Sequence, residues 1–532
     1  MDQRRFLIAL VLSFLLLLAY EQLVVRPYRK AQPVAPQDQT EQQPREGSAP
    51  VPGAPPTTLP THADTGLAAP LGDLPIVTVE TDLIRATITT VGARLKSLEL
   101  KNFRQTVDPS SPLLDLVKES QVLPLTVELG SGKSDATVVY TASAPALSAH
   151  GAEQGEVVFT GKTDDGLSIE KRYRFPGNSY LFGLDVSGKA TGQRVGLVLT
   201  PISEHGASGG QQSGLEHAVV FANGKVIQKK LDDLKQAGET PDALWAGFSA
   251  QYFAALAVPA SGTANVWLAT SDGIPIARVD IPASSDKAQF ELFLGPKDRE
   301  TLVAAGHQLD RALDFGWFWF IAVPLLWGLR FLHRFIPNYG VNIILLTGIV
   351  KLVTSPLTQT SFKSMKAMQK LRPEMQRLRE RYKDDQTTLQ KEVMELYKRH
   401  RVNPVSGCLP MLLQLPIFVG LYNALMHAIE LRHAPFMLWI NDLSAPDRLI
   451  VGAVHIPVLV LLMGASMLVQ QWMTPQQGDP AQQRMMLIMP VVFTFISFNF
   501  PSGLVLYWLV NNVLTMAQQW YMLRSENGGT RK

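Results

Sequence analysis

A single lysine lies in the middle of a long apolar stretch of this chain. The segment 341–360 reads VNIILLTGIVKLVTSPLTQT and is long enough to cross a hydrocarbon layer of ~30 Å as one helix. Lys351 lies near its centre, where inserting a lysine costs roughly 2.5–3.5 kcal/mol, and a charge at that depth usually has a function. The segment therefore predicts a membrane-spanning helix whose charged side chain is accommodated by protein or water.

Hydroxyl-bearing residues share a helical face with this lysine. Thr347, Thr354, Ser355 and Thr358 lie three, four or seven residues from Lys351, so an α-helix places all five on one side. Such a stripe could pair with a buried acid, or the lysine could extend toward the membrane surface. The other apolar segments hold no acidic residue away from their ends, so the sequence favours a wet, positively charged cavity without a fixed counter-ion.

The N-terminal residues predict a membrane anchor followed by a tether. Arg4 and Arg5 precede an apolar run, and no small-residue cleavage site of a signal peptide follows it. We therefore expect residues 1–26 to be a retained transmembrane anchor. Residues 27–75 contain eleven prolines among polar and small residues, a composition that cannot bury a core, so we expect a Pro-rich linker.

Residues 76–305 consist of short alternating segments between turn signals. IVTVET, LSIEKRYRF and AQFELFLG have the two-residue period of half-buried strands. The pairs Asp165-Gly166 and Asn223-Gly224 each separate two such segments and favour primed hairpin turns. The pattern predicts one large antiparallel β-sandwich.

The motifs of residues 76–305 do not indicate a catalytic or metal-binding site. GSGKS at 130–134 lacks the leading glycine of a phosphate-binding loop, and His205 and His217 have no metal-ligand spacing. VGARLKSLEL resembles the opening of sugar-mutarotase-like sandwiches, without a catalytic His/Glu set. Cys408 is the one cysteine of the chain, which excludes an internal disulfide framework. We expect no enzyme activity, no cofactor and no metal.

Residues 306–338 predict a helix in the membrane interface rather than a further span. The stretch is rich in tryptophan and phenylalanine, is interrupted by Pro324 and ends with Arg330, His333 and Arg334. Aromatic and basic side chains are typical of the membrane boundary.

The loop 363–403 predicts a basic helical hairpin on the cytoplasmic side. It has twelve lysines and arginines against six acidic residues, and short loops of this kind stay in the cytoplasm. Pro373 suits the first turn of one helix, and Asp384-Asp385 suits a turn and cap before a second. The hairpin either only enforces topology or docks onto a ribosome, an arriving chain or lipid headgroups.

The remaining apolar segments complete a predicted core of five spans in residues 339–532. Pro501-Ser502-Gly503 is expected to form the tip between the last two spans. With the basic loop inside, both termini are cytoplasmic and the β-sandwich is outside. The predicted spans are 341–361, 408–429, 449–473, 485–500 and 503–521.

Four motifs of the chain resemble a known family. These are GIVKLVTSPL at 348–357, NPVSGCLPMLLQLPIFVGLYNAL at 403–425, FPSGLVLYW at 500–508 and, in the β domain, WAGFSAQYFAALAVP at 245–259. They resemble the YidC membrane protein insertases, in the Gram-negative form with a large periplasmic domain. The resemblance implies a multi-pass α-helical inner membrane protein, with an N-terminal anchor and a five-helix core around a hydrophilic groove.

The resemblance also implies roles for particular residues. Lys351 corresponds to the groove cation, where many members have arginine; lysine keeps the charge but lacks the planar fork that binds a carboxylate. Tyr507 and Trp508 correspond to substrate-contacting positions. The polar residues expected to line the groove are Thr347, Thr354, Ser355, Thr358, Gln414, Asn423, Asn511 and Asn512.

The implied partners are nascent membrane proteins, the ribosome, the Sec translocon and the lipid bilayer. A net charge of +3 does not suggest direct binding of nucleic acid. Two other classes of protein are alternative interpretations of such a sequence. A secondary transporter would show internal repeats and a titratable acid, which the sequence lacks. A carbohydrate-modifying enzyme would use the β domain, but needs an acid/base pair that we do not find.

Overall fold

The structure is a computed structural model that describes most of residues 75–529. Residues 118–119, 121, 131, 190, 192, 205–215, 236–237, 384, 401, 403–408, 453 and 474–479 are not described. The predicted anchor at 1–26, nearly all of the predicted linker, His205 and Cys408 therefore lie outside the described residues. The chain forms two compact units: one comprises 362–407 with 475–488, and the other holds the β domain and most of the helices.

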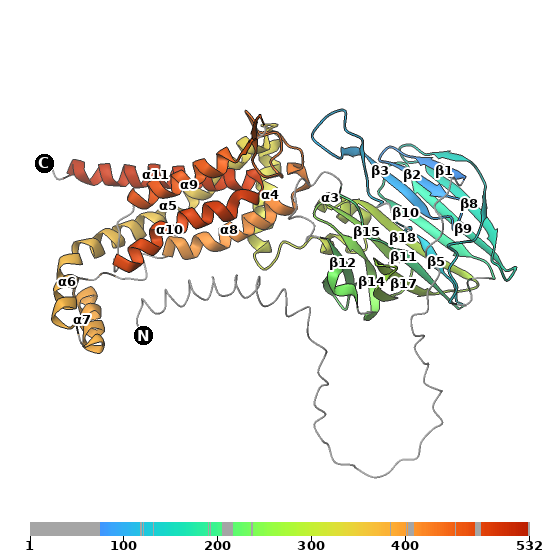
Figure 1. Cartoon of the computed structure of the whole chain (residues 1–532), viewed down its shortest axis with the longest axis horizontal. Helices are drawn as coiled ribbons and strands as arrows, with labels where there is room; N and C mark the ends of the chain where they lie inside the picture. The colour runs from blue at the N-terminus through green and yellow to red at the C-terminus, as the bar shows by residue number, and fades with distance from the viewer. Residues whose placement is uncertain are drawn as a thin grey trace, which may run out of the picture. The chain divides into compact units, whose positions relative to one another are not determined.

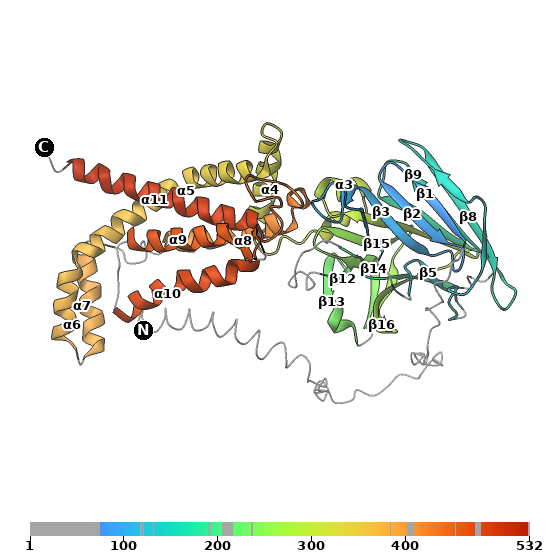
Figure 2. The same ribbon diagram turned by 45° about the horizontal axis from the view of Figure 1, so that its top comes forward.

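The β domain contains two sheets (Figures 1 and 2). The smaller sheet has the strand order β4-β3-β2-β1-β7, formed by Leu113–Asp115, Leu95–Arg104, Ile84–Thr89, Ile76–Glu80 and Ala146–Ser148. The larger sheet has 13 strands. Its path is β5 (Thr126–Glu128), β11 (Arg194–Leu199), β17 (Ile274–Pro282), β16 (Ala264–Ser271), β14 (Gly238–Ser249), β15 (Phe253–Pro259), β18 (Lys287–Pro296), β10 (Leu181–Ser187), β9 (Ser168–Pro176), β8 (Gln154–Lys162) and β6 (Tyr140–Ala142). Off this path, β12 (His217–Ala222) pairs with β14, and β13 (Lys225–Lys230) pairs with β12.

One hydrophobic cluster receives side chains from both sheets. Leu95 and Leu98 of β3 and Phe159 and Tyr173 of β8 and β9 belong to it, and each is fully buried. Buried and more exposed residues alternate along β9, as the two-residue period predicts. The arrangement is a β-sandwich, and it differs from the predicted one because β1 and β7 pair in parallel. Because the long connection between β1 and β7 brings the chain back so that both strands run in the same direction, the sandwich is not purely antiparallel.

The two predicted hairpin turns have different outcomes. Asn223 and Gly224 have φ values of 51° and 72° and join β12 to β13 directly, which confirms the primed turn there. The prediction is wrong at Asp165-Gly166. Residues 163–167 form a longer loop, which is closed by Thr163 and Leu167, and of that pair only Gly166 has a positive φ.

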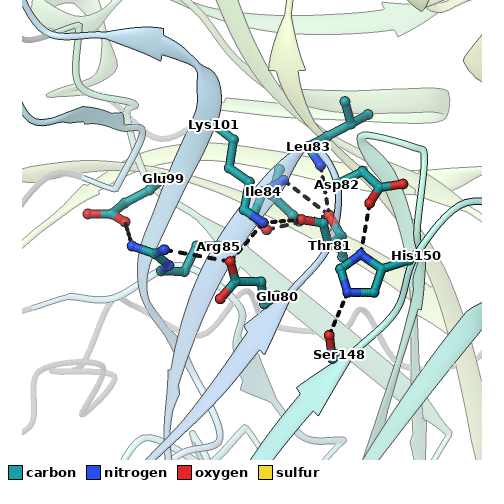
Figure 3. A network of polar contacts seen from close by, with 10 residues as sticks. All are labelled: Glu80, Thr81, Asp82, Leu83, Ile84, Arg85, Glu99, Lys101, Ser148 and His150. Carbon is teal, nitrogen blue, oxygen red and sulfur yellow. Dashed lines mark hydrogen bonds and ion pairs between the residues drawn. The ribbon is translucent and has the colours of Figure 1, made fainter. Parts of the chain in front are cut away.

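A polar network ties the smaller sheet together at its surface (Figure 3). Lys101 Nζ lies 2.8 Å from Glu80 Oε1, which also pairs with Arg85. Beside it, His150 links Ser148 Oγ at 2.9 Å to Asp82 Oδ1 at 2.8 Å, in the order of a Ser-His-Asp triad. These side chains are exposed, and the backbone N–H of Gly151 donates to Asp82. We interpret the network as a link between β7 and the turn that joins β1 to β2.

The helices of the C-terminal half follow α3 (Arg299–Ala305). They are α4 (Trp319–His333), α5 (Tyr339–Lys370), α6 (Arg372–Arg381), α7 (Gln386–Arg399), α8 (Leu409–His427), α9 (Val458–Met473), α10 (Pro480–Ile496) and α11 (Ser502–Gly529). Among the described residues, α5 is the one helix whose length and apolar composition suit a membrane crossing. The apolar helix α4, α9 and the apolar stretch Leu487–Asn499 are shorter.

One predicted span begins differently in the structure. Residues 449–473 were expected to form a single helix, but Leu449–Val451 (β19) and Val454–Ile456 (β20) form a hairpin. Gly452 has a φ of 62°, and Pro457 lies just before α9, so the helix begins only at Val458. The predicted spans 341–361, 408–429, 485–500 and 503–521 overlap α5, α8, α10 and α11.

The segment 371–400 forms a pair of helices in the smaller unit. Asp385 caps α7 by accepting hydrogen bonds from the backbone N–H groups of Thr387 and Thr388. The Tyr397 hydroxyl of α7 lies 3.0 Å from Met375 Sδ of α6. The preceding residues, up to Lys370, belong to α5 rather than to the helix pair.

Candidate functional site

Helix α5 has two distinct faces around Lys351. The exposed face is apolar and carries Leu345, Ile349, Leu352 and Val353 at helical spacing. The opposite face carries the predicted polar stripe. This division follows from the sequence, because the two sets of residues lie on opposite sides of one helix.

The ammonium of Lys351 contacts α11. Its Nζ lies 2.7 Å from Thr515 Oγ1 and 3.4 Å from Asn511 Oδ1. In the described part of the chain, none of the ion pairs involves Lys351. Neutral oxygen atoms of Thr515 and Asn511 therefore contact the ammonium, and the predicted wet cavity without a fixed counter-ion stays a prediction.

A second contact joins the same two helices. Gln518 of α11 donates to Ser355 Oγ at 2.9 Å, and Ser355 is one turn after Lys351 on α5. We define Lys351, Ser355, Asn511, Thr515 and Gln518 as the polar seam between α5 and α11. The seam places hydrogen-bonding groups beside a cation that has no ion-pair partner among the described residues.

The threonines of the predicted stripe use their hydroxyl hydrogens within α5. Thr347 donates to the Ile343 carbonyl at 2.6 Å, Thr354 to Val350 at 3.0 Å and Thr358 to Thr354 at 3.0 Å. Thr347 and Thr358 are buried. These hydroxyls offer acceptor oxygen atoms to a neighbour rather than donors, so they stabilise a nearby cation rather than an anion.

The predicted substrate-contacting residues lie in packed surroundings. Tyr507 is 2% exposed, and its hydroxyl accepts a hydrogen bond of 2.8 Å from Gln414. Trp508 stacks on Phe418 with ring centroids 4.3 Å apart and meets Phe493 edge-on at 4.3 Å. Contact with a substrate would therefore need side-chain movement at Tyr507.

Two predicted groove residues lie away from the polar seam. Asn423 donates to the Phe315 carbonyl at 2.8 Å, and so fixes the chain just before α4. Asn512 donates to Ser466 of α9 at 3.0 Å, on a different face of α11 from Asn511. The structure does not bring either amide to Lys351.

The chain matches known proteins along nearly its whole length. Residues 76–328 match the family model described as YidC periplasmic domain, and residues 331–528 match the one described as 60Kd inner membrane protein. A membrane protein insertase YidC of Geobacter metallireducens is 40% identical, over 98% of this chain and 98% of its own length. The chain belongs to the YidC membrane protein insertase family. A YidC of Pelobacter propionicus is 39% identical, over 99% of this chain and 100% of its own.

Membership of the YidC family indicates the class of protein and the cellular location of this chain. The family is one of inner membrane insertases rather than catalytic enzymes, and it includes a periplasmic domain that corresponds to residues 76–328 here. A crystal structure of an active YidC insertase covers 84% of this chain and 94% of its own, with 20% identity and a TM-score of 0.37.

Thr515 and Gln518 were missed by the sequence reasoning for this YidC family member. Both follow Asn511 at the i+4 and i+7 positions, so the same spacing argument that found the α5 stripe would have found them. Among the described residues, no cluster of histidine, cysteine or acidic side chains is placed to hold a metal ion.

Proposed function

We propose that this chain inserts transmembrane segments of newly made proteins from the cytoplasm into the inner membrane, with the polar seam as the hydrophilic part of the path. The observation that carries the proposal is the contact of Lys351 with Thr515 and Asn511 in place of an acidic partner. Moving the polar flank of an apolar segment through hydrocarbon is costly, because each unsatisfied polar group costs several kcal/mol. A cation with neutral neighbours lowers that cost for an acidic flank.

The proposed arrangement is multi-pass. An N-terminal anchor at 1–26 and five core spans place both termini in the cytoplasm, with the linker 27–75 and the β-sandwich 76–305 in the periplasm. The segment 306–338 lies in the membrane interface: α4 exposes Trp319, Phe320, Trp327 and Phe331, side chains that favour the headgroup level. Pro324 inside α4, and Arg330 and His333 in its last turn, also suit a position in the interface.

The driving force in this proposal is burial of the substrate's apolar segment in lipid. Lys351 attracts the acidic flank, while the apolar segment moves into the bilayer past the aromatic cluster of Trp508. No covalent bond is made or broken. The basic hairpin at 363–403 is the proposed docking region for a ribosome, and the Sec translocon is a proposed partner.

Site-specific crosslinking of a stalled, ribosome-bound nascent chain tests this proposal. A photoreactive residue at Ser355 or Gln518, next to Lys351 on the seam, is expected to crosslink the nascent chain. The same probe at Leu352 or Val353, on the exposed apolar face of α5, is the matched control and is expected to reach mainly lipid. Equal crosslinking from both faces would contradict a path along the seam.

Thr515→Val tests the contact that holds Lys351. The substitution keeps the shape of the side chain and removes the oxygen 2.7 Å from Nζ, so that only the longer, 3.4 Å contact with Asn511 Oδ1 holds the ammonium at the seam. We expect insertion of a substrate with an acidic flank to fall about two- to tenfold, the effect of one lost hydrogen bond. Thr360→Val on α5 is the control, because that exposed hydroxyl donates only to its own helix at Pro356. An unchanged insertion rate for Thr515→Val would show that the contact has no role.

A further inference from the structure

The hairpin formed by β19 and β20 presents apolar side chains outward. Ile450, Val451 and Val454 are 65%, 56% and 59% exposed. Val451 faces Val454 across the pair, and Ile450 faces His455. A short hairpin with three large aliphatic side chains at its tip is not explained by packing within the described chain.

The base of this hairpin is fixed by a buried carboxylate. Asp447 accepts a hydrogen bond from Trp439 Nε1 at 2.6 Å and another from the backbone N–H of Leu459, in the first turn of α9. The residues just before and just after the hairpin are thereby joined through one side chain. The hairpin is a fixed projection at the N-terminus of α9 rather than a loose loop.

The same segment is attached to the turn between α10 and α11. The backbone N–H of Ser502 donates to the Ala445 carbonyl at 2.8 Å, and that of Gly503 donates to Leu443 at 2.9 Å. In the proposed topology this end of the helices faces the periplasm. The hairpin therefore lies where α9 and α11 leave the membrane.

Two observations indicate what covers the apolar tip. The exposed side chains continue into α9, where Leu461 and Leu462 are also exposed, so the hairpin extends an apolar surface that suits lipid. Arg448, just before β19, is exposed and can bind the phosphates of lipid headgroups. Apolar residues beside a basic residue are typical of segments that lie at the membrane interface.

The hydrogen bonding of the hairpin limits how deep it lies. In the described part of the chain each strand pairs only with the other, so the outer edge of each leaves backbone groups without a partner strand there. Such groups are not tolerated in hydrocarbon but are hydrated among headgroups. We propose that Ile450, Val451 and Val454 anchor the hairpin in the headgroup region of the periplasmic leaflet, an inference that rests on the proposed crossing of the membrane by α9.

Fluorescence quenching in lipid vesicles tests this anchor. In the full-length chain with Cys408→Ser, an environment-sensitive dye is attached at Val451→Cys, and the protein is reconstituted in phosphatidylcholine with phosphatidylglycerol. Nitroxides on the headgroup, or deep on the acyl chain, report depth, and iodide reports exposure to water. We expect blue-shifted emission at Val451, with several-fold stronger quenching by the headgroup nitroxide than by the deep one.

Two control positions separate the possible failures. Val139→Cys, on the exposed surface of the β domain, is expected to be quenched by iodide alone. Ala465→Cys, an exposed position near the middle of α9, is expected to be quenched by the deep nitroxide, and its failure would contradict the proposed topology instead. If Ala465 behaves as expected while Val451 is quenched by iodide alone, by the deep nitroxide most strongly, or by none of the three quenchers, the anchor is wrong. The last result would indicate a protein surface over the tip.

Discussion

Replacing Lys351 with alanine is expected to reduce insertion of substrates with an acidic translocated flank by about tenfold or more. Two unit charges ~6 Å apart attract by about 3 kcal/mol at an effective dielectric constant of 20, and 1.4 kcal/mol corresponds to a factor of ten. The substitution removes this attraction and leaves Thr515 hydrogen-bonded to the Asn511 carbonyl at 2.6 Å. We therefore expect α5 and α11 to keep their fold in the alanine variant, while the site loses its positive charge. Protease protection of the flank in inverted vesicles measures insertion.

Two further substitutions test whether the charge of residue 351, rather than its shape, determines insertion. Lys351→Arg is expected to retain most activity, because the positive charge remains. Lys351→Glu is expected to be worse than alanine, because repulsion replaces attraction. The matched control is the same substrate with its acidic flank changed to asparagine and glutamine, for which the alanine variant should resemble the parent chain. An equal defect with the acidic and the neutral flank would show that Lys351 acts through folding.

The elements that periodicity controls could be predicted from the sequence. The strands of the β domain alternate between buried and more exposed residues, and the polar stripe on α5 occupies one helical face, because both patterns are set by local geometry. The charge of Lys351 could also be placed, since a lysine within an apolar span needs polar neighbours. The sequence motifs also identified the family and its periplasmic domain.

Features that depend on tertiary contacts could not be predicted in the same way. The residues 449–456 are as apolar as a span, and only Gly452 and Pro457 distinguish the hairpin from the helix that follows. The amides Asn423 and Asn512 have the composition of a groove lining, but their partners are Phe315 and Ser466, which no spacing rule connects to them. The parallel pairing of β1 with β7 likewise depends on a long connection.

A buried ion pair inside the β-sandwich carries the largest predicted effect on stability. Lys171 Nζ lies 2.6 Å from Asp135 Oδ2 and donates to the carbonyls of Gly92 at 2.7 Å and Leu125 at 2.9 Å. Both charged side chains are 0% exposed. Burial lowers the pKa of Lys171, and Asp135 acts in the opposite direction by attracting the charged form. The three ammonium hydrogens thus all have partners in the fully buried core.

Lys171→Met is expected to destabilise the β domain by about 3–5 kcal/mol, because breaking a buried pair leaves the Asp135 carboxylate without its counter-ion. The carboxylate keeps its hydrogen bonds from the Val127 N–H and the Tyr140 hydroxyl, but the two carbonyl oxygens lose the ammonium donor. Lys133→Met is the matched control: Lys133 pairs with Asp165 at 2.9 Å, but these side chains are 60% and 52% exposed. Such a surface pair contributes about 0–1 kcal/mol. Pulse proteolysis of the full-length chain at increasing urea concentrations measures the stability of the β domain in both variants. The unfolding midpoint is the urea concentration at which half of the protease-protected β-domain fragment is lost. Equal shifts of the two midpoints would mean that burial does not decide the strength of these pairs.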